Sequence, residues 1–208
     1  MSVKYTKLFI TIFIFILTIV PSAFSKDDCN FKFTVESEGK IVGGMGEIKT
    51  TMYHKNCYEW VQEQNINMGG INQKSTIVNK DGYTYINNNG SWTKTKDPST
   101  DNIKKMREEG KTNKDVIISL GGKPLNKESN EYLEPCSFWS FMGGKVCYTK
   151  DWIPVYIENQ AMEFKAINIK RNESGPESLY EVPANVPESD FMQGGEMPDM
   201  KELMKEAM

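Results

Sequence analysis

The chain has 208 residues, of which 38% are hydrophobic and 25% charged, and its formal net charge is −3. Its 25 basic residues are outnumbered by 28 acidic ones and form no basic stripe, so composition excludes a nucleic-acid footprint. A solvated acidic surface is a sufficient account of this charge.

The first 25 residues have the pattern of an export signal. Lys4 and Lys7 give a positive start, residues 8–20 are apolar, and Ala23-Phe24-Ser25 is typical of a cleavage site. The apolar run is short for a bilayer span, although an uncleaved membrane anchor is the alternative. Cys29 does not follow the small residues that precede a lipoprotein cysteine. We therefore predict a periplasmic or secreted protein cleaved after Ser25.

Removal of residues 1–25 leaves a chain of 183 residues, which is the length of one domain. This chain has 23 basic and 28 acidic residues, so its net charge is −5. Export favours disulfides, and four cysteines allow three pairings. No pair has the CxxC spacing of a redox motif or zinc knuckle; metal binding by all four is the alternative. We expect Cys29–Cys57 and Cys136–Cys147.

The first half of the chain predicts an antiparallel meander. Residues 31–36 alternate between apolar and polar and continue to Val42, and residues 47–61 are predicted to return as one long strand after a glycine loop. This pairing places Cys29 near Cys57. Residues 75–78 and 83–86 form a hairpin across Asp81-Gly82, and Asn89-Gly90 turns the chain again. Residues 65–72 are expected to form a polar loop.

A charged segment then interrupts the strands. Asp97-Pro98 is typical of a helix start, residues 101–111 predict a short helix, and residues 113–120 predict a second helix or a strand. The apolar face of the first helix is narrow and contains Ile103 and Met106. We interpret residues 98–120 as a flap over the sheet.

A second meander follows at residues 132–183. Cys136 and Cys147 flank Gly143-Gly144 on the two arms of a hairpin, and residues 152–157 and 162–170 form another. The predicted fold class is therefore mainly β (α+β), an antiparallel curved sheet with short helices. Residues 185–208 form a Pro-, Gly- and Met-rich tail, in which residues 197–208 have the periodicity of a helix.

No catalytic set emerges from the residue types and their spacing. His54 is the only histidine and lies in a strand-like run, where a structural role is the more common one. Nucleophile-elbow, zinc-protease and nucleotide-binding motifs are absent from the sequence, so we expect no enzyme, no cofactor and no metal site. Methionines in the tail at residues 192, 197, 200, 204 and 208 could bind copper(I), or could form one apolar helix face.

Aromatic residues recur along the predicted strands. They are Phe31, Phe33, Trp60, Tyr83, Tyr85, Trp92, Phe138, Trp139, Trp152, Tyr156 and Phe164. A curved sheet with an apolar concave face could bind a lipid or acyl chain. The alternative is an ordinary packed core beneath the helices.

Several segments together resemble a known group. They are Asp81–Lys94, Cys136–Cys147, Trp152–Tyr156, Ala166–Ile169 and Leu179–Ala184. In this order, after an export signal and around a helical interruption, they resemble the LolA-like lipoprotein-carrier superfamily over residues 31–183. The resemblance implies an unclosed antiparallel half-barrel over residues 26–184, with short lid helices above an apolar cavity.

The resemblance also implies a non-catalytic carrier or binding role for a lipidic ligand or an acylated protein. We expect a monomer with transient membrane contact, and a ligand site formed by Trp60, Tyr85, Trp92 and Phe164 together with Ile103 and Met106 of the flap. The lipoprotein carriers use an arginine on an early strand, whereas this chain has only Arg107 and Arg171, both later. A cell-envelope interaction module and a copper-handling protein are the alternatives.

Overall fold

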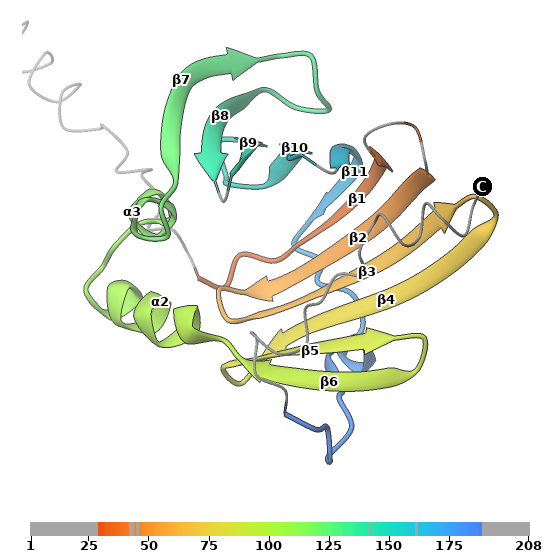
Figure 1. Ribbon diagram of the computed structural model, residues 1–208. Helices are drawn as coiled ribbons and strands as arrows, with labels where there is room; N and C mark the ends of the chain where they lie inside the picture. Colours follow the sequence, from red (N-terminus) through yellow and green to blue (C-terminus); the bar gives the residue numbers. More distant parts are fainter. Residues whose placement is uncertain (1–28, 42–43, 45, 142, 161, 189–208) are drawn as a thin grey trace, which may run out of the picture.

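The computed structural model describes residues 29–41, 44, 46–141, 143–160 and 162–188 (Figure 1). Within them the chain forms one antiparallel sheet of 11 strands that does not close, which confirms the predicted half-barrel class. The predicted export signal and the predicted C-terminal helix lie outside the described residues. Among the described helices, none is long and apolar enough to cross a membrane.

The first six strands form a continuous meander. They are β1 (Phe33–Ile41), β2 (Gly46–Asn56), β3 (Glu59–Met68), β4 (Ile71–Lys80), β5 (Tyr83–Asn88) and β6 (Ser91–Lys96). Both residues of Asp81-Gly82 and both residues of Asn89-Gly90 have positive φ, as two-residue hairpin turns require. The two predicted turns are therefore confirmed.

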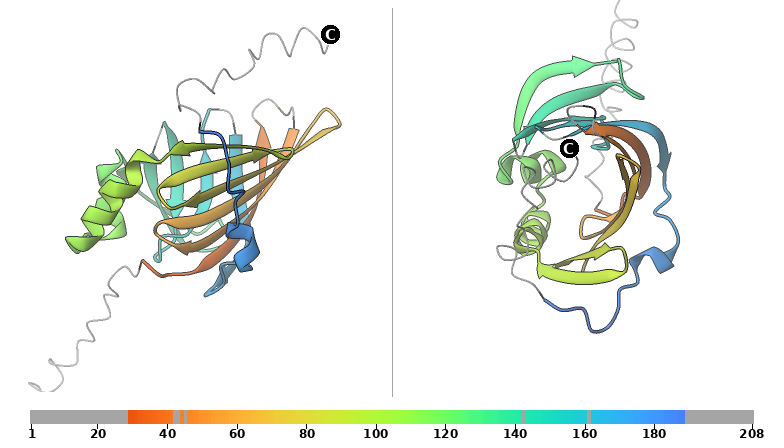
Figure 2. Two further views of the ribbon diagram at one scale, coloured as in Figure 1. Left: turned by 90° about the horizontal axis from the view of Figure 1, so that it is seen from below. Right: turned by 45° about the vertical axis from the view of Figure 1, so that its right-hand side comes forward.

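The second meander has five strands. They are β7 (Lys123–Ser129), β8 (Cys136–Phe141), β9 (Gly144–Tyr148), β10 (Pro154–Glu158) and β11 (Met162–Arg171). β11 pairs with β1, so the first and last strands lie together in the sheet, and β6 and β7 form its two edges. β6 and β7 are nevertheless consecutive in the sequence, and their connection holds α2 (Pro98–Glu108) and α3 (Asn113–Ser119). The two helices therefore span the open side of the half-barrel (Figure 2).

Two predicted strand boundaries were wrong. The long strand at residues 47–61 is divided by a turn at Cys57-Tyr58, because the Asn56 side chain accepts hydrogen bonds from the backbone amides of Tyr58 and Glu59 and stops the ladder there. The predicted loop at residues 65–72 is strand except for the Gly69-Gly70 turn. β7 was not predicted, since its side chains are almost all exposed and show no buried face.

Both predicted disulfides are confirmed. Cys29–Cys57 joins the segment before β1 to the β2–β3 turn, with a Cα–Cα distance of 5.1 Å. Cys136–Cys147 joins β8 to β9, with a Cα–Cα distance of 5.4 Å. Disulfides persist in oxidising compartments, so the two bonds indicate an extracytoplasmic environment.

The outer strap, residues 172–188, crosses the convex face of the sheet (Figures 1 and 2). It starts beside β1, where the Thr34 hydroxyl donates to the Glu173 carbonyl, and ends beside β6, where the Lys94 amide donates to the Pro187 carbonyl. Its 3-10 helix η1 (Glu177–Tyr180) inserts Tyr180 against Val61 and Val78. The strap thus links the centre of the sheet to one of its edges.

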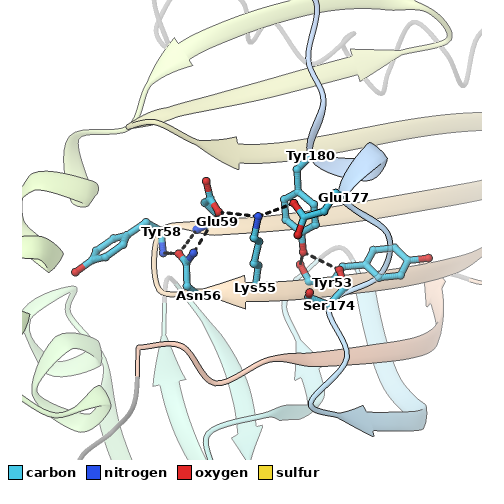
Figure 3. Close-up of polar contacts among 8 residues, drawn as sticks. All are labelled: Tyr53, Lys55, Asn56, Tyr58, Glu59, Ser174, Glu177 and Tyr180. Atoms are coloured by element: carbon cyan, nitrogen blue, oxygen red, sulfur yellow. Dashed lines mark hydrogen bonds and ion pairs between the residues drawn. The ribbon is translucent and has the colours of Figure 1, made fainter.

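Tyr180 is the main anchor of the outer strap (Figure 3). Its ring is 2% exposed, and its hydroxyl lies 2.9 Å from the Ser174 carbonyl oxygen and 3.2 Å from that of Tyr53. Lys55 lies over the ring at 5.1 Å and forms an ion pair with Glu177 at 2.7 Å. Packing, hydrogen bonding and charge therefore fix the strap at one point.

We expect Tyr180→Phe to lower the free energy of unfolding by roughly 1–2 kcal/mol, because it removes the hydroxyl that donates to the buried Ser174 carbonyl oxygen. The measurement is urea unfolding followed by fluorescence. Tyr85→Phe is the matched control: Tyr85 packs against the same cluster, and its hydroxyl makes no hydrogen bond to any described residue. Equal losses in both variants would contradict this account of the anchor.

Candidate functional site

The inner cavity lies between the concave face of the sheet and α3, and has a volume of about 330 Å³. Side chains on its sheet side come from cross-strand neighbours, since Phe33 of β1 pairs with His54 of β2, and His54 pairs with Trp60 of β3. The volume is at the lower end of the range for small-molecule pockets, roughly 300–1,000 Å³.

Aromatic rings form a large part of the cavity wall. They are Phe31, Phe33, Trp60, Phe141, Tyr148 and Trp152, and they come from both meanders. α3 contributes the aliphatic side chains of Val116, Ile117 and Leu120. The wall is therefore mainly apolar, with His54, Asn113 and Asp151 as its polar members, as expected for a site that binds mostly by burial of surface.

α3 presents this apolar face because its start is fixed. Thr112 and Asp115 form a reciprocal capping box, in which the Thr112 hydroxyl accepts from the Asp115 amide and the Asp115 carboxylate accepts from the Thr112 amide. Val116 is then 8% exposed toward the sheet, whereas Ile118 on the opposite side is 47% exposed. The cap thus fixes the residue at which α3 begins, and in this helix Val116 and Ile117 face the cavity.

Trp152 enters the cavity wall from a strained backbone position. Its φ is +66°, a rare value for a bulky side chain. The turn around it is held by Thr149, whose carbonyl accepts from the Trp152 amide and whose hydroxyl accepts from the Ile153 amide, both at 3.0 Å. The Trp152 ring then lies against Trp139 at 5.4 Å and Tyr148 at 5.7 Å.

Arg171 of β11 braces the same turn from outside. Its guanidinium donates to both carboxylate oxygens of Glu134 and to Asp151, with N–O distances of 2.6 and 2.8 Å to Glu134 and 2.7 Å to the Oδ2 atom of Asp151. Burial alone would raise the pKa of Asp151, but hydrogen bonds from Arg171 and Thr149 outweigh it and hold that pKa below its usual value. The Asp151 carboxylate at the rim therefore stays ionised and is paired with Arg171, which also pairs with Glu134.

A smaller hollow of about 50 Å³ adjoins the inner cavity and shares Met52 and Pro154 with it. Phe164 lines this hollow and is packed tightly: a Cβ added at Gly39 would lie 2.6 Å from its ring. The glycine thus makes room for the ring.

The structure does not bring together all six residues predicted for the ligand site. Trp60 lines the inner cavity and Phe164 the adjoining hollow. Tyr85 and Trp92 instead pack with Tyr180 on the convex face, because Tyr85 pairs with Val78 and shares its side of the sheet. This corrects the expectation of one common face.

The flap residues also differ from expectation. Ile103 and Met106 of α2 are half-buried but do not line the cavity, whereas Val116 and Ile117 of α3 do. His54, Phe141 and Tyr148 were missed as wall residues. The period of two places His54 on the predicted face of Trp60 and Phe141 on that of Trp139, whereas the strand of Tyr148 has no other aromatic residue. Burial raises the pKa of Tyr148 to about 12, so its hydroxyl stays protonated.

No protein-family model matches the chain, and the comparison with curated proteins found no similar sequence. Among solved structures, an uncharacterized conserved protein from Thermus thermophilus is 8% identical with a TM-score of 0.48, over 77% of this chain and 91% of that one. Two structures of PNGF-II are 14% and 12% identical, with TM-scores of 0.41 and 0.44, over 78% and 85% of this chain. This chain spans 31% and 34% of their length.

We expect Arg171→Ala to lower the free energy of unfolding by about 1 kcal/mol at neutral pH, since the groups are about one-third exposed and partly screened. Because the folded-state pKa of Asp151 is depressed, its contribution is present above the unfolded pKa of about 3.9 and is lost as pH falls through the folded value. The difference from wild type in urea unfolding should therefore shrink in acid.

Lys145→Ala is the control for this prediction, because it breaks a more exposed pair with Glu158 and should cost only a few tenths of a kcal/mol. A difference between wild type and Arg171→Ala that stays constant down to acid pH would show that the Asp151 charge does not brace the turn.

Proposed function

We propose that this protein is an exported, non-catalytic binding or carrier module for a lipidic or acylated ligand, with the inner cavity as its site. The observation that carries the proposal is a cavity of about 330 Å³ with rings on the sheet side and aliphatic side chains on α3. The half-barrel class and the resemblance to lipoprotein carriers support it. Export to a periplasmic or secreted location, with cleavage after Ser25, belongs to the same proposal.

The energetics of such a site need no charged contact. At about 25 cal/mol per Å², removing roughly 200–400 Å² of alkyl surface from water contributes roughly 5–10 kcal/mol before the costs of ordering. Micromolar affinity corresponds to about 8 kcal/mol. Burial of an alkyl chain in the inner cavity therefore contributes, before those costs, a free energy of the same order as that of micromolar binding.

The alternative of an envelope protein-interaction module has one observation in its favour. The β3–β4 hairpin ends in Met68 and Ile71, which are 40% and 74% exposed. Exposed apolar side chains at a projecting tip are suited to contact with another surface. The cavity and the tip make different predictions, because only the cavity site depends on α3. The copper-handling alternative concerns methionines outside the described residues.

We expect the protein to bind a fluorescent alkyl probe saturably, and Ile117→Asp to weaken binding by at least about tenfold, because it puts a charge into an apolar wall. The measurement is probe titration by fluorescence, with near-ultraviolet circular dichroism to verify folding. Ile118→Asp is the matched control, since the next residue of the same helix is 47% exposed and does not line the cavity.

Probe binding that is unsaturable, or equally weakened by both substitutions, would refute the inner cavity as the site. Loss of binding after Ile71→Asp with Ile117→Asp unchanged would instead favour the hairpin tip and the interaction module.

A further inference from the structure

The only histidine of the chain lies in the inner cavity with its ring orientation fixed. Nδ1 of His54 lies 2.9 Å from the carbonyl oxygen of Phe31, and the ring stacks on Phe33 with a centroid distance of 4.5 Å and an interplanar angle of 7°. A carbonyl oxygen has no proton to give, so Nδ1 carries the proton and donates it. In the neutral ring, Nε2 therefore holds a lone pair.

Nε2 makes no hydrogen bond to any residue in the described part of the chain. Nε2 is not fully enclosed by protein atoms, so it remains accessible to a ligand. His54 lines the inner cavity, where its neighbours Phe33 and Met52 have no donor and the indole N–H of Trp60 makes no hydrogen bond to Nε2. The free lone pair is thus a polar point in an otherwise apolar part of the wall.

The segment that orients His54 is held by a disulfide. Cys29–Cys57 joins the two chain segments, and the Cys57 amide donates to the Cys29 carbonyl at 3.0 Å. This brings residues 29–33 alongside residues 54–57 and holds the Phe31 carbonyl against Nδ1. The disulfide therefore helps to keep the Phe31 carbonyl oxygen in place as the acceptor for Nδ1, which leaves Nε2 as the lone-pair nitrogen.

We propose that Nε2 of His54 accepts a hydrogen bond from the polar end of the bound ligand, and that this ligand is an uncharged amphiphile with a hydroxyl or amide N–H donor. The inference rests on the proposed function and deepens it by naming the chemistry of the ligand. A ligand with a charged end would bury its charge beside rings, which is costly without a partner.

At neutral pH His54 is uncharged, and the one ionised side chain that lines the cavity, among the described residues, has an ion-pair partner. Burial lowers the pKa of His54, which outweighs the opposing effect of the hydrogen bond to Phe31. The other titratable groups that line the cavity are Asp151, which is paired with Arg171, and Tyr148, whose pKa is raised to about 12 by burial. Cys57 is in a disulfide, and α3 contributes Asn113 and aliphatic side chains.

The test compares a fatty alcohol, its methyl ester and its carboxylate, all with the same chain length, by displacement of the alkyl probe. We expect the alcohol to bind roughly three- to tenfold more tightly than the ester, which has no donor. His54→Phe keeps a ring in place and removes the acceptor, so the ratio of alcohol affinity to ester affinity in this variant should fall to about one.

Nuclear magnetic resonance of the untagged wild-type protein gives a second measurement that does not depend on a variant. The imidazole signals come from one residue, and the alcohol should shift them and lower the pKa of His54 further. Because only the neutral ring accepts, whereas the imidazolium can donate to an ester carbonyl, the preference for alcohol over ester should fall as pH falls through that pKa.

Equal affinities for alcohol and ester, or a preference that survives in His54→Phe, would overturn this inference and leave the apolar site intact. Tightest binding of the carboxylate, with uptake of a proton, would overturn the uncharged ligand and assign an imidazolium–carboxylate pair. Failure of all three compounds to displace the probe would overturn both this inference and the proposed function.

Discussion

The pairing of β1 with β11 is the constraint on which the rest of the structure depends. Because these two strands lie together, the two meanders extend from them in opposite directions and place β6 and β7 at the far edges of the sheet. β6 and β7 are consecutive in the chain, so the segment between them has to cross the open side. The topology alone therefore puts α2 and α3 over the concave face, before any contact of the helices is considered.

The inner cavity follows from this arrangement and from three local restraints. The capping box of α3 turns Val116 and Ile117 toward the sheet, and the braced turn at residues 149–153 holds Trp152 in a strained conformation beside them. The Cys29–Cys57 disulfide fixes the Phe31 segment next to His54. Restraints from both meanders thus converge on one end of the half-barrel, whereas the outer strap fixes the convex face.

The sequence predicted the parts of the fold that depend on local chemistry. Asp81-Gly82 and Asn89-Gly90 specify their turns, and the two disulfides followed from the expected hairpins. The division of residues 47–61 escaped prediction because Asn56 makes its turn through side-chain bonds that alternation does not reveal. β7 escaped because its side chains are exposed and it has no apolar period.

The site was harder to predict than the fold because alternation shows which residues share a strand face but not which face is concave. Trp60 and Tyr85 are both aromatic residues on neighbouring hairpins, yet one faces the cavity and the other faces Tyr180. The convex cluster needs the outer strap, whose path cannot be read from spacing. Likewise, Ile103 and Met106 were predicted from the narrow apolar face of α2, whereas Val116 and Ile117 of α3 are the helix residues that line the cavity.

The central claim is that an alkyl chain lies between α3 and the concave face. Photolabelling with an alkyl diazirine, followed by peptide mapping, tests it most directly. The account predicts labels on α3 around Val116 and Ile117 and on Trp60 and Trp152, all suppressed by excess unlabelled amphiphile. Labels concentrated on Tyr85 and Trp92 of the convex face, or on Ile71 at the hairpin tip, would contradict it.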